Sequence, residues 1–172
     1  MTSNDKLARA AHLVIARLPP DDLGATKLNK ILWFADCEFY RRHGRSLTGE
    51  VEYVRKDNGP CPVQMNDVIA RLKQEGAIAE RAQQIAQYTR REFTPLSQPD
   101  IDAFTAEEVD ILLGVALEIA PMSAKRASDI SHDDLWEATP HNGRMSVEAG
   151  SVKVLPPTPE VVDWARRAFA AE

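Results

Sequence analysis

The N-terminal part of the chain has the apolar spacing of amphipathic helices. Apolar residues that recur at intervals of three and four positions form the first stripe. This stripe consists of Leu7, Ala10, Ala11, Val14, Ile15 and Leu18. Pro19-Pro20 ends this helix, because proline has no amide hydrogen to donate and clashes with the preceding turn. A second helix is predicted from about Thr26. Its stripe consists of Leu28, Ile31, Leu32, Ala35 and Phe39, and Gly44 can close it in the left-handed conformation.

The next region predicts a turn, a helix and a hairpin. Residues 50–56 have the character of an extended segment, and Asn58-Gly59-Pro60 forms a turn because glycine tolerates positive φ and proline presets its own. A third helix is predicted to start at Pro62 and to stop at Gly76. Residues 78–81 and 88–93 then form the two arms of a β-hairpin.

The C-terminal part predicts further helices. Thr105 and Glu108 have the spacing of a capping box. The most apolar helix follows and is expected at the centre of the core, with a stripe formed by Val109, Leu112, Leu113, Ala116, Leu117 and Ala120. A short helix is expected over 123–130, a half-helix over 132–138, a strand at Val152 and Val154, and a last helix that carries Val161, Trp164, Ala165, Ala168 and Phe169.

These elements predict a mainly α fold. We expect one compact domain over 1–172, with about six helices and one or two small β-hairpins in an α+β arrangement. The order helix, helix, helix, hairpin is that of a winged-helix domain. A chain of 172 residues can bury about two-thirds of its unfolded surface, so it needs no disulfide or metal to fold.

Charge and composition limit the compartments in which the protein can work and the partners that it can bind. The net charge of −5 is uneven, since residues 1–99 carry 15 basic and 12 acidic residues and residues 100–172 carry 6 and 14. An acidic half repels nucleic acid and anionic membranes and attracts a basic protein, although it can also be a solvated surface. Two cysteines, no signal peptide and no apolar run of about 20 residues favour a cytoplasmic protein without a membrane partner.

No motif for catalysis or cofactor binding is present. The chain lacks a phosphate-binding glycine loop and a nucleophile elbow, so we expect no enzyme and no cofactor. Cys37 falls within the second helix as a buried thiol, whereas Cys61 lies in an exposed turn without a histidine nearby. A hydrolase that uses Cys61 or His132 is the weakest hypothesis.

The densest polar cluster allows two interpretations. Ser131-His132-Asp133-Asp134, with His141 nine residues after His132, combines imidazoles and carboxylates that could bind a metal. The same residues suit a helix N-terminus, with Ser131 as the cap and the carboxylates near the positive end of the helix dipole. The histidine spacing matches no recurrent ligand pattern, so no metal site is predicted.

DNA binding is the alternative function that the element order suggests. Arg81, Arg90 and Arg91 would lie on the wing. However, the third helix, which would read the DNA, carries two basic and two acidic residues, so its net charge is zero. Because phosphate contacts supply most of the non-specific affinity, nucleic acid is an unlikely partner for this acidic chain.

One stretch carries a family resemblance. Residues 27–36, Lys-Leu-Asn-Lys-Ile-Leu-Trp-Phe-Ala-Asp, resemble the signature helix of the Panacea antitoxin domain, also described as SocA-like or phage-associated GepA-like. Gly44, Leu47 and Gly49 resemble the loop of that family. Residues 53–56 with Gly59-Pro60 resemble its strand and turn, and Ser131, His132 and Trp136 resemble its closing element. The resemblance covers about 5–140 and is strongest over 26–62.

The resemblance implies an antitoxin that neutralises a cognate toxin encoded nearby by direct contact. Masking of the toxin and delivery to a protease both remain open. Polar and aromatic residues off the apolar stripe of the second helix, and those that follow it, are of the types that anchor interfaces. The predicted partner-binding residues are Lys27, Lys30, Asp36, Tyr40, Arg41, Arg42, Arg45, Tyr53, Arg55 and Asn58.

Overall fold

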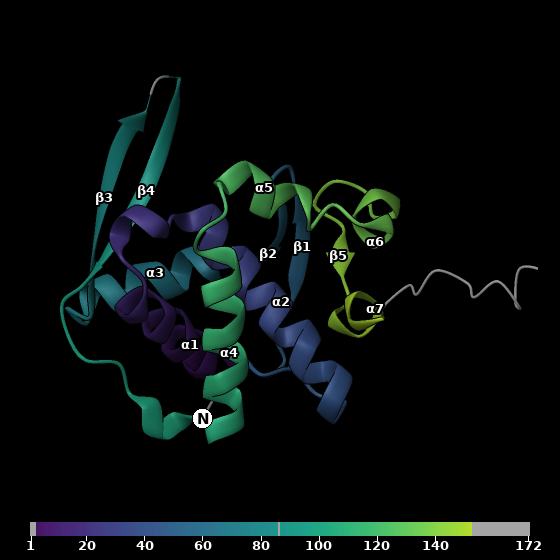
Figure 1. Cartoon of the computed structure of the whole chain (residues 1–172), viewed down its shortest axis with the longest axis horizontal. Coiled ribbons are helices and arrows are strands. Elements are labelled where there is room, and N and C mark those ends of the chain that lie inside the picture. The colour runs from purple at the N-terminus through teal and green to yellow at the C-terminus, as the bar shows by residue number, and fades with distance from the viewer. Residues whose placement is uncertain (1–2, 86, 153–172) are drawn as a thin grey trace, which may run out of the picture.

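The computed structural model describes residues 3–85 and 87–152. Its elements follow one another as shown in Figure 1. In chain order they are α1 (Ser3–Arg17), the short 3-10 helix η1 (Pro20–Asp22), α2 (Ala25–His43), β1 (Tyr53–Lys56), β2 (Gly59–Pro62), α3 (Met65–Gln74), β3 (Ile78–Ile85), β4 (Tyr88–Pro95), η2 (Ile101–Ala103), α4 (Ala106–Ile119), α5 (Ala124–Asp129), α6 (Asp134–Ala138), β5 (Arg144–Met145) and α7 (Val147–Ser151). The fold is mainly helical with small β-hairpins, as the sequence predicts.

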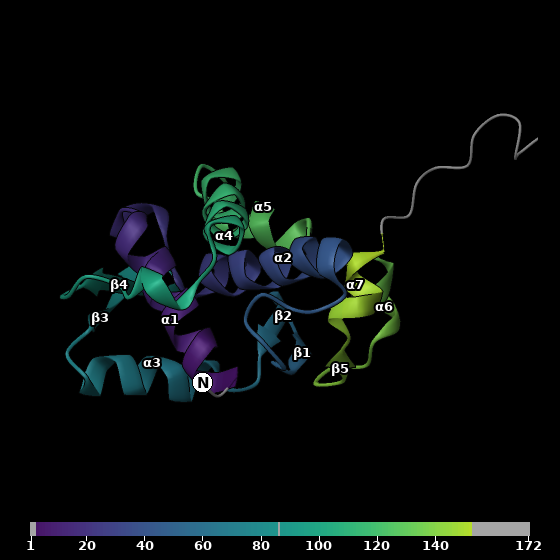
Figure 2. The ribbon, with the colours of Figure 1, turned by 90° about the horizontal axis from the view of Figure 1, so that it is seen from below.

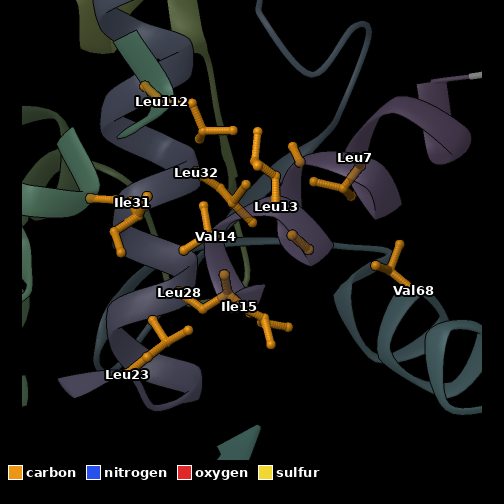
Figure 3. Close-up of a cluster of buried hydrophobic side chains, with 14 of the residues drawn as sticks. Leu7, Leu13, Val14, Ile15, Leu23, Leu28, Ile31, Leu32, Val68 and Leu112 are labelled. Atoms are coloured by element: carbon orange, nitrogen blue, oxygen red, sulfur yellow. The ribbon is translucent and has the colours of Figure 1, made fainter. Parts of the chain in front are cut away.

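The helices are arranged around α1 and α2. Figure 2 shows α4 and α3 on opposite sides of the layer that these two helices form. The whole predicted stripe of α1 is buried. Figure 3 shows Val14 and Ile15 of α1 beside Leu28 and Leu32 of α2, with Leu112 of α4 above them. All five of these side chains belong to the buried core, and α2 packs against more elements than any other helix does.

Two small antiparallel sheets complete the fold. β1 pairs with β2 and with β5, so the strand order is β2-β1-β5, while β3 and β4 form a separate hairpin. The β3–β4 hairpin projects from one end of the molecule, and β5 with α6 and α7 lies at the other end (Figure 1). The pairing of Tyr53 with Met145 brings α7 against α2, although 110 residues separate Cys37 from its α7 contact at Val147.

Two helix boundaries differ from the sequence-based prediction. The third helix starts at Met65 and not at Pro62, because Pro62 pairs with Tyr53 in β2. Ser131 does not cap α6; Asp133 does, through a side chain that accepts a hydrogen bond from the amide of Trp136. The capping box of α4 is present as predicted, with reciprocal bonds between Thr105 and Glu108.

The buried face of α4 includes Leu112 and Ala116 of the predicted stripe but differs from it at other positions. Leu117 is 69% exposed and Leu113 is only partly buried, whereas Ile111 and Ile119 belong to the core with Leu112. Most positions of this helix are apolar, so the sequence allows several stripes and only the packing against α2 selects one. The central helix is therefore α2 and not α4.

The C-terminal predictions fall partly outside the described residues. Val152 follows α7 directly and forms no strand. Val154 and the last predicted helix, with Val161 to Phe169, lie outside the residues that the structure describes. Of the helices within 3–85 and 87–152, none is both long and apolar enough to cross a membrane.

Candidate partner-binding surface

Lys30 connects α2 to the β1–β2 turn. Its side chain is 1% exposed, and its Nζ donates to the carbonyl oxygen of Pro60 at 2.7 Å. Gly59 has φ +100°, and a Cβ on it would lie 2.7 Å from Lys30 Nζ and closer still to the hydroxyl of Ser131. Only glycine therefore fits at position 59. Burial lowers the pKa of Lys30 to about 7.

Two serines fix the other side of the same turn. Ser131 donates to the carbonyl of Ser128, and the hydroxyl of Ser128 donates to the carbonyl of Asn58, each at 2.7 Å. Residues from α2, from the β1–β2 turn and from the end of α5 thus meet at one place. We call Lys30, Gly59, Pro60 and Ser131 the Lys30 joint. It brings together three segments that carry the resemblance, although they are far apart in sequence.

Lys27 makes a second internal connection. Its Nζ donates to the carbonyl oxygens of Asp22 at 2.9 Å and of Ala120 at 2.7 Å. Ala120 is the C-cap of α4, where unpaired carbonyls give the helix a partial negative charge that a cation stabilises. Lys27 therefore fastens the start of α2 to the end of α4, and burial lowers the pKa of its ammonium group.

Asp36 holds the loop after α2. It is fully buried and accepts hydrogen bonds from the amide and hydroxyl of Thr48 and from the hydroxyl of Tyr53, the last at 2.7 Å. Burial raises the pKa of Asp36 to about 6, against the opposing effect of these hydrogen bonds. The ring of Tyr53 in turn meets Trp33 edge to face at 5.0 Å. This cluster ties the loop 44–49 and β1 to the helix.

Lys27, Lys30 and Asp36 lie off the apolar stripe of α2, but they do not face solvent. These three residues and Tyr53 are at most 9% exposed, which leaves them almost no surface for a partner. The amphipathic pattern treats every charge as solvated. Here other elements cover the polar face, and backbone carbonyls, hydroxyls and an amide satisfy the charged groups. The signature residues on α2 hold the fold together.

Other predicted residues do reach the surface, at the C-terminal end of α2. Arg41 and Arg42 both contact the carboxylate of Glu38, and Arg41 also donates to the carbonyl of Ser151 at 3.0 Å. Arg45 lies over the ring of Phe39, 3.3 Å from Glu108. Tyr40 is half-buried and packs against a smaller hydrophobic cluster that includes Trp33 and Tyr53.

Arg55 and Asn58 lie near a stack of side chains around the ring of Trp136 in α6. The guanidinium of Arg55 lies 3.9 Å from the centre of the Trp136 ring, and the imidazole of His132 stacks on that ring at 3.8 Å. Trp136 donates to the carbonyl of Lys56 at 3.0 Å. Nε of Arg55 is buried and has no hydrogen-bond partner among the described residues. Asn58 is exposed beside this stack.

A groove lies between α2 and α4. Its volume is about 750 Å³, and its floor is apolar, formed by Phe34, Ile111, Val115, Ile119, Met122 and Ile130. Glu38, Arg41 and Arg42 line it from α2, and Glu107, Asp110 and Glu118 line it from α4. We call this site the α2–α4 groove. The sequence prediction missed its α4 side, although Glu107, Asp110, Gly114 and Glu118 have the helical spacing of one face.

The groups considered for chemistry are not activated. Cys37 is buried, as predicted, and burial raises the pKa of its thiol, as it also does for Cys61. His132 stacks on Trp136, whereas His141 pairs with Asp57 at 3.2 Å, so each histidine has its own contacts. Residues 3–85 and 87–152 contain no group of three or more His, Cys, Asp or Glu side chains placed to bind a metal ion.

The basic residues of the possible DNA-binding module face carboxylates. Glu80 accepts from Lys73 at 2.8 Å and from Arg91 at 2.5 Å, and Glu92 accepts from Arg81 at 2.7 Å. Arg71 of α3 likewise bonds Asp5 and Glu75. An α3–hairpin unit with its cations paired in this way presents little positive potential to a phosphate backbone.

Comparison with known proteins identifies one family. Residues 28–137 match the family described as antitoxin SocA-like, Panacea domain. The match contains the Lys30 joint and the whole of α4. No significant match was found among curated proteins or among solved structures.

Proposed function

Since the chain belongs to the SocA-like antitoxin family with a Panacea domain, we propose that it neutralises a cognate toxin by binding it directly. The match over residues 28–137 carries this proposal, because it contains every element that forms the Lys30 joint. The surfaces described above support it physically. An apolar groove with a charged rim and an arginine stacked on a tryptophan are the features that protein interfaces use.

The proposal includes a role without catalysis, cofactor or metal. Burial raises the pKa of both thiols, which keeps them in the poorly nucleophilic protonated form. The α2–α4 groove has an apolar floor and a rim of ion-paired and free carboxylates, which suits recognition of a protein surface. We expect a cytoplasmic protein that acts on a toxin encoded nearby.

Co-expression with the product of the adjacent reading frame tests the function. The neighbouring protein should arrest growth when it is expressed alone, this chain should restore growth, and the two should elute as one complex in gel filtration. A neighbour that remains lethal, with the chain eluting only on its own, would contradict the proposal.

The same complex separates masking from delivery to a protease. If the chain masks the toxin, the purified complex should be inactive in a toxin assay without any protease. If the chain delivers the toxin, the purified complex should retain toxin activity, and rescue in cells should disappear in strains that lack the relevant protease.

A further inference from the structure

We propose that the α2–α4 groove is the surface that receives the toxin, and that its occupant is an amphipathic helix with basic residues beside its apolar stripe. This proposal rests on the proposed antitoxin function and specifies the site and chemistry of the contact. Its support is the apolar floor of the groove, the free carboxylates on its rim and the glycine in the middle of α4.

The groove runs along most of α4. Its lining extends from Glu107 to Met122, and its volume is about 750 Å³. Helix α4 has 14 residues, so it is about 21 Å long, or roughly four helical turns. Partly buried side chains, including Phe34, Val115 and Met122, pack against the core from its floor. A helix laid there would bury apolar anchors at intervals of three and four residues.

The charges on the rim define the partner. Glu38 contacts Arg41 and Arg42, and Glu107 contacts Arg42 at 3.7 Å and His43 at 3.1 Å. Asp110 and Glu118 are exposed and make no ion pair within the described residues. The rim thus carries four carboxylates against two guanidinium groups. Lysine or arginine on the partner would complete these pairs and speed the encounter, whereas an acidic partner would be repelled.

Gly114 provides the room for a close approach. It lines the groove in the middle of α4, and a Cβ placed on it would meet nothing within 4 Å. A glycine inside a helix costs about 0.8–1.0 kcal/mol relative to alanine, and no neighbour in this structure requires it. At this position a partner helix can approach the backbone of α4 directly.

Two variants test the site from different directions. Gly114→Trp fills the groove, and the double change Asp110→Lys with Glu118→Lys reverses its free charges. Matched controls place the same changes elsewhere on exposed helical positions: Ala70→Trp on α3, and Asp67→Lys on α3 with Glu148→Lys on α7. Asp67 and Glu148, like Asp110 and Glu118, make no ion pair within the described residues.

The measurements are calorimetric affinity for the purified toxin and thermal melting of each full-length variant. Both groove variants should bind about 10- to 100-fold more weakly than the wild type, because like charges or a blocked floor oppose docking. Both controls should bind as the wild type does, and all variants should melt cooperatively. If only one groove variant folds, its affinity decides the question.

Other outcomes overturn the proposal in distinguishable ways. Wild-type affinity in both groove variants would remove the toxin from the groove but leave the antitoxin function intact. A wild-type dimer that both groove variants dissociate while they still bind toxin would assign the groove to a second copy of the chain. A wild-type chain that neither binds the toxin nor rescues growth would overturn both the function and the docking site.

Discussion

The two halves of α2 place their positively charged side chains in different environments. Lys27 and Lys30, in the N-terminal half, are buried and bind backbone carbonyls of distant segments. Arg41 and Arg42, in the C-terminal half, are exposed and contact carboxylates at the edge of the α2–α4 groove. Buried and unpaired charges are costly, whereas exposed ion pairs contribute little. Lys27 and Lys30 thus stabilise the fold, and the positive charges available to a partner lie in the C-terminal half of α2.

Charge reversal in the two halves should give the largest difference. Lys30→Glu places a carboxylate against the carbonyl of Pro60 in a buried site, which should cost about 3–5 kcal/mol of unfolding free energy or more. Arg42→Glu changes an exposed residue and should cost about 1 kcal/mol or less. Urea unfolding of both variants measures the comparison. Equal losses would show that Lys30 has no special structural role.

Gly59 in the Lys30 joint and Gly44 at the C-cap of α2 offer a second comparison. Gly59→Ala must accommodate a positive φ and a Cβ 2.7 Å from Lys30 Nζ, so we expect a loss of about 2–4 kcal/mol. Gly44→Ala, at the C-cap of α2, has φ +66° but meets nothing within 4 Å. Its cost should be only the left-handed strain of about 1–2 kcal/mol. Thermal melting would contradict the Lys30 joint if Gly44→Ala were the more damaging change.

A smaller effect should appear in the pH dependence of stability. Burial lowers the pKa of Lys30 to about 7 in the folded chain, while its ordinary value of 10.5 applies to the unfolded chain. Above pH 7 the unfolded state therefore binds more protons, and the unfolding free energy rises with pH. The rise is followed over about pH 7 to 9. Because unfolded thiols, with an ordinary pKa of about 8.5, titrate in the upper part of this window, the effect of Lys30 is taken from a comparison with a variant that keeps both cysteines.

The variant Lys30→Met isolates this contribution. It removes the ammonium group while keeping an unbranched side chain of similar length, so the rise between about pH 7 and 9 should become smaller than in the wild type. Denaturant unfolding at several pH values measures the difference. Parallel pH profiles for the two proteins would show that Lys30 keeps its ordinary pKa when folded.

The sequence predicted the local elements well because local rules determine them. The stripe of α1, the capping box of Thr105 and Glu108 and the β3–β4 hairpin all depend on residues close in sequence. β5 and α7 were missed, since elements of two and five residues show no periodicity. The two residues of β5 pair with β1, a partner about ninety positions away.

The candidate site was harder to predict, because tertiary contacts create it. The burial of Lys30 depends on Pro60 and Ser131, which no helical pattern places beside it. The groove needs α2 and α4, whose facing residues Glu38 and Glu107 are far apart in the chain. The carboxylates on one face of α4, Glu107, Asp110 and Glu118, were the available signal, and a solvated face explains such a pattern equally well.

Carboxyl footprinting of the free chain and of its complex with toxin tests the central claim most directly. A water-soluble carbodiimide with an amine label should modify Asp110 and Glu118 in the free protein, since both are exposed. In the complex, mass spectrometry should find these two protected, while Asp67 and Glu148, outside the groove, are labelled as before. Unchanged labelling of Asp110 and Glu118, with protection instead at Asp57 and Glu137 around the Arg55–Trp136 stack, would contradict the account.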